Sequence, residues 1–186
     1  CFVIGIDIDL NRGKLAESLG LDYFINASNQ QMVEDIQKKT GGNGADGIII
    51  TAASSSSEII SQSFEMCRKK GRVVLVGSVG LALNRADFYK KEIDFLISTS
   101  YGPGRYDPNY EEKGLDYPIG YVRWTEKRNM ELYLGMIATG RLNVDPLVHK
   151  IYDIDEAPAA YSSLRNKDNK PLMVILKYAD FHPAAK

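Results

Sequence analysis

The chain has 186 residues, 44% hydrophobic and 25% charged, which is enough to bury a core in one domain, or in one domain and part of another. A formal net charge of -1 without any basic run argues against nucleic acid as a partner. No apolar stretch approaches the roughly 20 residues that span a bilayer, and no signal peptide opens the chain. Cys1 and Cys67 lack a CxxC context, so we expect a reduced, cytoplasmic protein.

The first readable segment, residues 3–9, is a short apolar run that stops at Asp7. A nearly continuous β-branched run predicts a strand of a parallel sheet that is buried on both faces. An acid where the run stops lies at the carboxyl edge of the sheet, where ligands of open α/β folds bind. Residues 11–19 follow with helical spacing, and Gly20 can end that helix at positive φ. These features are typical of the second strand and helix of a dinucleotide-binding fold, whose acid accepts hydrogen bonds from the adenosine ribose.

Further strands alternate with helices at the cadence of βαβ units. The predicted strands cover residues 23–26, 48–51, 71–77 and 93–98. The strand 48–51 has no polar alternation, which implies burial on both faces. Asp94 indicates that the strand 93–98 is an edge strand whose polar side chain reaches water. The first hundred residues therefore predict five mostly parallel strands with helices between them.

Two of the intervening helices carry predicted caps. Ser28 and Gln31 form a capping-box pattern ahead of one helix, and the serine run 54–57 supplies an N-cap for the next. The inward stripe of that second helix consists of Ile59, Ile60, Ser63, Phe64 and Cys67. Gly77 ends the strand 71–77, and a glycine at that place lets a ligand approach the backbone closely.

The segment 101–124 has no helical or alternating period and is rich in tyrosine and arginine. Loops of this length are usually functional or disordered. Three interpretations stay open for this one: a lid that contacts the substrate, a subunit interface, or plain packing.

The remaining elements continue the α/β pattern. Thr125 can cap a helix with Met130, Tyr133, Leu134 and Ile137 on one face, ended by Gly140. A strand at 147–152, a helix capped by Asp155 with Pro158 in its first turn, a strand at 172–176 and a polar tail at 180–186 complete the chain.

The run from GIDID through GADGIIITAAS and KKGRVVLVGSVG to GRLNVDPLVHKIYDIDEAPAAYSSL resembles the medium-chain dehydrogenase/reductase superfamily, the zinc-type alcohol dehydrogenases. The stretch SYGPGRYDPNYEEKGLDYPIGYVRWTEKRNME is similar to a bacterial subgroup fused to a glucose-fructose-oxidoreductase-like domain and associated with cell-surface sugar metabolism. The resemblance implies a partial NAD-binding Rossmann domain over residues 1–100. Residues 101–186 would form a long loop and a segment that returns to the catalytic domain.

The same resemblance implies that this chain is a fragment. The N-terminal catalytic domain and the first Rossmann strand with its glycine-rich phosphate loop have no counterpart in it. We therefore expect the gap between the strands of Asp7 and Ile48 to be closed by direct pairing, by another chain or by a segment absent from this sequence.

The resemblance also assigns cofactor contacts. Asp7 would bind the adenosine ribose, and Arg12 would flank the adenine side. Ala52 and Ala53 would lie beside the cofactor; Val76, Gly77 and Ser78 would line the nicotinamide pocket; the main chain of Thr99 and Tyr101 would bind the carboxamide. Met173 stands where some members place an arginine that reaches the pyrophosphate.

NAD is the expected cofactor, because Asp7 would repel the 2′-phosphate of NADP by about 1 kcal/mol or more, an effect that Arg12 tempers. The implied reaction is hydride transfer between an alcohol and NAD, with a sugar hydroxyl among the alcohols that the resemblance implies. Zinc would act as the Lewis acid in the N-terminal domain. No catalytic or metal-binding residue is assigned within this chain, since neither His149 nor His182 has a partner at ligand spacing. We expect a small-molecule substrate and a homodimer formed through the edge strand 93–98.

Three alternatives compete with this interpretation. Rossmann-like methyltransferases, which use S-adenosylmethionine, also end their second strand with an acid that binds a ribose. Residues 7–9 match the D-x-D motif of metal-dependent glycosyltransferases, although nothing else supports that chemistry. The chain could also serve as a non-catalytic dimerisation or scaffold domain.

Overall fold

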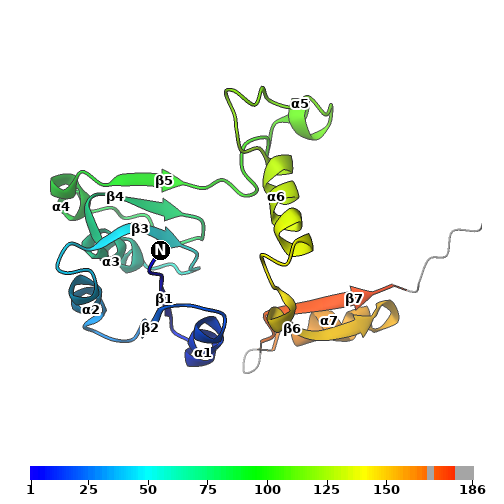
Figure 1. Ribbon diagram of the computed structural model, residues 1–186, viewed down its shortest axis with the longest axis horizontal. Helices are drawn as coiled ribbons and strands as arrows, with labels where there is room; N and C mark the ends of the chain where they lie inside the picture. Colours follow the sequence, from blue (N-terminus) through cyan, green and yellow to red (C-terminus); the bar gives the residue numbers. More distant parts are fainter. Residues whose placement is uncertain (167–169, 179–186) are drawn as a thin grey trace, which may run out of the picture. The chain divides into compact units, whose positions relative to one another are not determined.

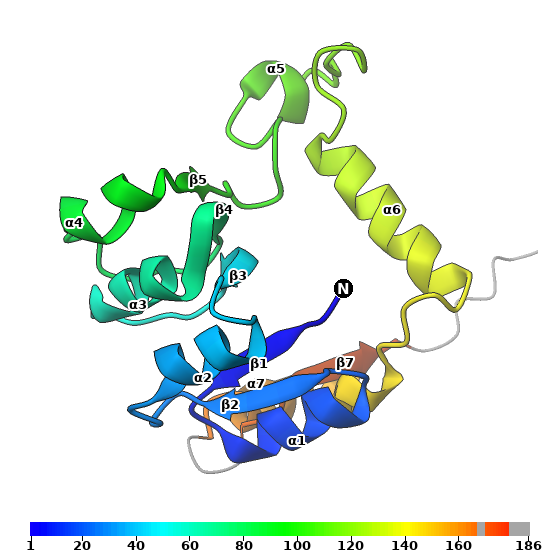
Figure 2. The same cartoon turned by 60° about the vertical axis from the view of Figure 1, so that its left-hand side comes forward.

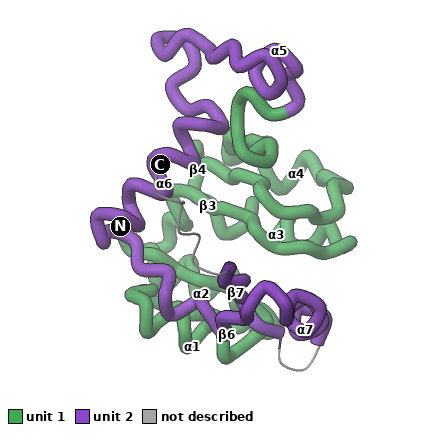
Figure 3. The backbone as a smooth tube through the Cα atoms, turned by 90° about the vertical axis from the view of Figure 1, so that its right-hand side faces the viewer, with its two compact units in different colours: residues 1–105 green, residues 106–186 purple. Residues whose placement is uncertain are grey.

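The computed structural model describes residues 1–166 and 170–178. The chain divides into two compact units, Cys1–Arg105 and Tyr106–Lys186, which Figure 3 shows in different colours. The predicted polar tail 180–186, with His182, lies outside the described residues.

The first unit alternates strands and helices, as Figure 1 shows. Its elements are β1 (Ile4–Asp7), α1 (Leu10–Ser18), β2 (Tyr23–Asn26), α2 (Met32–Lys39), β3 (Ala45–Ile50), α3 (Glu58–Met66), β4 (Cys67–Leu75), α4 (Arg85–Phe88), η1 (Tyr89–Lys91) and β5 (Asp94–Ile97). Every strand pair in it is parallel. The predicted α/β class is therefore confirmed.

The five strands are divided between two sheets at the place where the gap is expected. β1 pairs with β2 in one sheet, and β3, β4 and β5 form a second in that order. Direct pairing of the Asp7 strand with the Ile48 strand is absent from the described residues. β3 is consequently an edge strand here, and Ile49, predicted to be buried, is 69% exposed.

Helix α1 lies close against β2, as Figure 2 shows. Gly13 makes this possible, because a Cβ there would meet the ring of Phe24 at 2.4 Å. Gly20 follows the helix with φ of 100°, as predicted.

The core of the first unit lies between α3 and the second sheet. The predicted stripe of α3 is confirmed, since Ile60 and Phe64 are buried and pack with Val73 of β4. Cys67 belongs to the same cluster. A second cluster joins α2 to β2 and to Met66 at the end of α3.

The predicted cap of α2 is wrong, and that of α3 is confirmed in its position within the serine run but not as a side-chain cap bond of Ser57. The Ser28 hydroxyl bonds to the side chain of Asn26 instead of capping a helix, and α2 begins after Gln31 without a side-chain cap. Ser57 occupies the N-cap of α3, but its hydroxyl accepts from the amide of Ala82. Short polar side chains bond equally well within turns, which is why the sequence pattern misleads here.

The second unit is described by itself. Its elements are α5 (Pro108–Glu111), α6 (Glu126–Ala138), η2 (Asp145–Leu147), β6 (Val148–Asp153), η3 (Ile154–Glu156), α7 (Ala157–Ser163) and β7 (Met173–Lys177). β6 and β7 pair in parallel, and α7 packs against both of them.

Three details differ from the prediction for this unit. Asp153, rather than Asp155, forms a capping box, and it does so for η3 ahead of α7. Thr125 occupies the N-cap of α6 but makes no side-chain cap bond. The apolar stripe of α6 has no buried residue, although the helix itself and its end at Gly140 are as predicted.

Candidate functional site

The sequence-predicted cofactor residues of the first unit all lie at or just beyond carboxyl ends of parallel strands. Asp7 and Arg12 belong to β1 and α1; Ala52 and Ala53 follow β3; Val76, Gly77 and Ser78 follow β4; Thr99 and Tyr101 follow β5. Asp7 is in the two-stranded sheet and the residues of the later strands are in the three-stranded one. The assignment of these residues to one cofactor site therefore stays a prediction, because they lie in two different sheets.

Asp7 is the last residue of β1, and the protein partners of its carboxylate, Asp9 and Arg12, both come from the segment that follows. The backbone amide of Asp9 donates to its Oδ1 at 2.9 Å. Its Oδ2 lies 3.8 Å from Nη1 of Arg12, and the side chain is 35% exposed. Because each carboxylate oxygen can accept more than one hydrogen bond, Asp7 retains acceptor capacity toward solvent. This arrangement fits a diol such as the ribose hydroxyls.

Asp9 is a residue of this neighbourhood that sequence reasoning missed. It is the N-cap of α1, and its Oδ1 accepts from the amide of Asn11 at 2.8 Å and from that of Arg12 at 3.4 Å. Its Oδ2 also lies 3.7 Å from Nε of Arg12. An acid directly before a helical segment is a cap signal, and that signal could have identified Asp9.

The loops after β3 and β4 are joined by their backbones. The amide of Ser78 donates to the carbonyl of Ala52 at 3.0 Å, and the amide of Ser54 donates to the carbonyl of Ser78 at 2.8 Å. Ala53 and Ser78 accordingly form an isolated parallel bridge. The structure thus brings together the predicted residues of these two strands.

Gly77 has a reason to be glycine in addition to the predicted one. A Cβ at this position would lie 2.1 Å from the carbonyl oxygen of Ala52 and 2.7 Å from the carbonyl carbon of Thr51. The close approach of the neighbouring loop is by itself a reason for glycine at this position, and the predicted approach of a ligand stays a prediction.

Thr99 and Tyr101 lie in a turn after β5. The carbonyl of Thr99 accepts from the amide of Gly102 at 2.8 Å, so this main-chain acceptor is already used inside the turn. The side chain of Tyr101 is exposed. Met173 begins β7 in the second unit.

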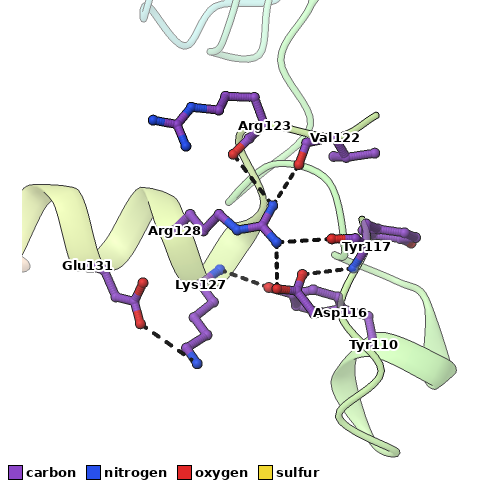
Figure 4. A network of polar contacts seen from close by, with 8 residues as sticks. All are labelled: Tyr110, Asp116, Tyr117, Val122, Arg123, Lys127, Arg128 and Glu131. Carbon is purple, nitrogen blue, oxygen red and sulfur yellow. Dashed lines mark hydrogen bonds and ion pairs between the residues drawn. The ribbon is translucent and has the colours of Figure 1, made fainter. Parts of the chain in front are cut away.

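The tyrosine-rich segment is ordered, in the second unit, by one arginine of α6. The guanidinium of Arg128 donates to Asp116 Oδ2 at 2.6 Å and to the carbonyls of Tyr117 and Val122 at 2.9 and 2.6 Å (Figure 4). The rings of Tyr110 and Tyr117 stack with centroids 5.5 Å apart. This part of the predicted loop is therefore fastened to the first turn of α6.

Tyr117 also binds Asp107, the N-cap of α5. The phenol donates to the carboxylate, and this hydrogen bond lowers the pKa of Asp107 and raises the pKa of Tyr117. Tyr117 is thus held by α5 on one side and by Arg128 of α6 on the other.

Two kinds of feature are absent from the part of the chain that is described. Within it, no three His, Cys, Asp or Glu side chains gather to form a metal site. Within it, too, every helix is too short or too polar to cross a bilayer.

The parallel strands, the helices between them and the acid at the end of β1 define an α/β protein of the dinucleotide-binding type. The sequence model of the zinc-binding dehydrogenases matches residues 1–113. The chain therefore belongs to the zinc-binding dehydrogenase family, and the predicted superfamily is confirmed.

Its relatives carry the names of several dehydrogenases. An NAD-dependent alcohol dehydrogenase of Sulfurisphaera tokodaii is 36% identical over 167 residues, which are 88% of this chain and 40% of the relative. An alcohol dehydrogenase of Cupriavidus necator is 25% identical over 94% of this chain and 42% of its own length. The chain thus spans less than half of these relatives.

The fold agrees with solved structures. Benzyl alcohol dehydrogenase from Acinetobacter calcoaceticus superposes with a TM-score of 0.69 at 22% identity, over 96% of this chain and 43% of that one. Alcohol dehydrogenase TADH from Thermus sp. ATN1 gives 0.67 at 23% identity, over 95% and 43%. These likenesses support the fold alone.

Proposed function

We propose that this chain is the cofactor-binding portion of an NAD-dependent dehydrogenase. The observation that carries the proposal is the carboxylate of Asp7 at the end of a parallel strand, with one oxygen anchored by Asp9 and acceptor capacity left toward solvent. Two adjacent hydroxyls of a ribose match such an acceptor. The name of the Sulfurisphaera relative, an NAD-dependent alcohol dehydrogenase, supports the same cofactor.

NAD is proposed over NADP on the ground of charge. A 2′-phosphate beside Asp7 would be repelled by about 1 kcal/mol or more in water-exposed surroundings. Arg12 lies between Asp7 and Asp9, so its positive charge is shared by two carboxylates.

The proposed reaction is hydride transfer between an alcohol and NAD, with a sugar-derived alcohol as the proposed substrate. A D-arabitol-phosphate dehydrogenase of Enterococcus avium, 24% identical over 93% of this chain, and a sorbitol dehydrogenase are among the relatives. The zinc that the family name implies finds no donor set in the described residues, so no step is assigned to it here. Within this proposal, the chain contributes cofactor binding and orientation.

Replacing Asp7 by alanine tests the proposal. Since a hydrogen bond to a charged group contributes about 1.5 to 3 kcal/mol, we expect Asp7→Ala to weaken NAD binding by about 10 to 100-fold in the protein that carries this chain. Titration calorimetry with NAD measures this change. Asp22→Ala is the matched control, because that carboxylate binds the amide of Val3 at the opposite end of the same strand.

The same titration separates the alternatives. Unchanged NAD affinity in Asp7→Ala would remove the assignment of Asp7. Binding of S-adenosylmethionine instead of NAD would favour a methyltransferase. Binding of neither would leave a scaffold role.

We also propose a homodimer through β5. This strand is an edge of its sheet, Leu96 and Ile97 are exposed on it, and Asp94 pairs with Arg72 at its surface. A monomer in sedimentation experiments at micromolar concentration would contradict this assembly.

A further inference from the structure

We propose that Asn26 is a positioning residue of the nucleotide site, because it fixes the peptide group that orients the carboxylate of Asp7. The proposal rests on the proposed function, in which Asp7 binds the adenosine ribose, and adds to it a residue from the neighbouring strand. The position of Asn26, its hydrogen bonds and the direction of those bonds support this role.

Asn26 is the last residue of β2 and the parallel partner of Asp7 in β1. The two strands lie side by side in Figure 2. Beyond this pair, the backbone contributes one more bond, from the amide of Ala27 to the carbonyl of Asp7 at 2.9 Å. The half-buried side chain of Asn26 therefore lies beside the point where the chain leaves β1.

The side chain of Asn26 continues the contact where the backbone pairing ends. Its Nδ2 donates to the carbonyl of Ile8 at 3.1 Å. The same peptide group carries the amide of Asp9, which donates to Asp7 Oδ1 at 2.9 Å. A hydrogen bond to the carbonyl polarises the peptide group, and this strengthens the bond that its N–H makes. One planar peptide thus connects Asn26 to the carboxylate of Asp7.

The amide of Asn26 is suited to this contact in one orientation only. Its Oδ1 accepts from the amide of Ser28 at 2.9 Å and also from the hydroxyl of Ser28. A flipped side chain would place its oxygen against the carbonyl of Ile8 and its nitrogen against the amide of Ser28, so both bonds would be lost. Ser28 therefore keeps the donor of Asn26 directed at Ile8.

The conformation that Asn26 opposes is a rotated peptide between Ile8 and Asp9. Because a peptide group is planar, its N–H and its C=O turn together. Rotation would remove the N–H from Asp7 and bring a carbonyl oxygen, a second acceptor, toward the carboxylate. Without the donor of Asn26, the carboxylate should therefore lose its fixed orientation. A ligand that needs that orientation would then bind more weakly, because binding has to order the carboxylate first.

The test measures how strongly the protein that carries this chain recognises the ribose hydroxyls. The probes are 5′-ADP and 2′,3′-dideoxyadenosine 5′-diphosphate, which has the same base and phosphates but neither hydroxyl. Titration calorimetry gives the affinity of each. We expect Asn26→Ala to weaken 5′-ADP by about 3 to 10-fold, the effect of one neutral hydrogen bond, and to leave the dideoxy probe unchanged. The affinity ratio of the two probes should decrease accordingly.

Two further variants separate the donor of Asn26 from its bulk. Asn26→Asp keeps the shape and the acceptor for Ser28 but lacks the donor, so it should lower the same ratio even if Asn26→Ala does not fold. Its added charge acts on the phosphates of both probes alike. Asn29→Ala is the matched control, because that asparagine binds Gln31 and Asp35 in the next turn and should leave the ratio unchanged.

A double variant shows whether Asn26 acts through Asp7. Asp7→Ala combined with Asn26→Ala should bind 5′-ADP no more weakly than Asp7→Ala alone, because the group that Asn26 positions is already absent. A merely structural role of Asn26 would weaken binding further in the double variant, and this result would overturn the proposal.

The remaining outcomes separate this role from the proposed function. An unchanged ratio in Asn26→Ala and Asn26→Asp, in a protein that binds 5′-ADP and NAD, would overturn the role of Asn26 and leave the proposed function intact. Equal weakening of both probes is such an unchanged ratio. A protein that binds neither 5′-ADP nor NAD would overturn the proposed function, and the role of Asn26 with it.

Discussion

Replacing Phe64 by alanine should open the core of the first unit. The side chain of Phe64 is 1% exposed, and its ring lies 5.3 Å from that of Phe88 and 5.4 Å from that of Phe95, measured between centroids. Truncation of a buried phenylalanine costs about 3 to 5 kcal/mol. The two ring pairs contribute about 0.5 to 1.5 kcal/mol each within that sum.

Cys67 provides the assay for this substitution. Its thiol is fully buried in the same cluster, and burial raises the pKa of the thiol, so reaction with a thiol reagent requires local opening. A loss of 3 to 5 kcal/mol should speed the labelling of Cys67 by about 10² to 5 × 10³-fold. Cys1 is exposed and serves as an internal reference that reacts at the same rate in both proteins.

Phe2→Ala is the control for Phe64→Ala. Phe2 is 60% exposed, so the same substitution should leave the labelling rate of Cys67 nearly unchanged. If Phe64→Ala changes that rate no more than Phe2→Ala does, the cluster does not hold α3 on the sheet as described.

Two other predictions concern the second unit. Arg128→Ala removes charge-assisted bonds to Asp116 and to two carbonyls, and should lower the local stability of residues 116–125 by about 1.5 to 3 kcal/mol, seen as faster amide hydrogen exchange there. Lys127→Ala, whose side chain pairs with Glu131, should not have this effect. The hydrogen bond from Tyr117 lowers the pKa of Asp107, so its stabilising effect should be complete above pH of about 4 and lost as pH falls through the lowered pKa. Because the pKa of Tyr117 is raised, the effect should be complete below pH of about 10 and be lost as pH rises through the raised pKa. Hydrogen exchange of residues 107–117 across this range measures both limits, and an identical profile in Asp107→Asn would contradict the assignment.

The periodicity of the sequence predicted the helices and strands well, because apolar spacing reflects which residues face a core. Residues 23–26 form a strand with the predicted bounds, and the stripe with Ile60 and Phe64 is buried. Strand order is a different matter, since it depends on which strands are neighbours in space. Ile49 is exposed while its neighbour Ile50 is buried, because successive side chains of a strand point to opposite faces and only one face of β3 is covered; no local pattern contains that information.

The candidate site was predictable in its placement and less so in its detail. An acid at the end of an apolar run marked Asp7 correctly as a strand-end residue. The link between Asp9 and Arg12 depends on where α1 begins, and helical spacing fixes that position only within a residue or two. The sequence predicted that Gly77 lets a ligand approach the backbone. It did not predict the close approach of Ala52, because that contact follows from the pairing of two loops far apart in the sequence.

The division of the strands into two sheets bears on how the chain behaves in concentrated solution. An unpaired strand edge accepts any extended polypeptide, since backbone amides and carbonyls form the bonds whatever the side chains are. In the described part of the first unit, β1 and β3 each present such an edge, and Ile49 adds an apolar side chain to one of them. Most surface substitutions would therefore not prevent aggregation by strand addition. Ile49→Lys would oppose it, because it places a charge on the exposed edge strand itself.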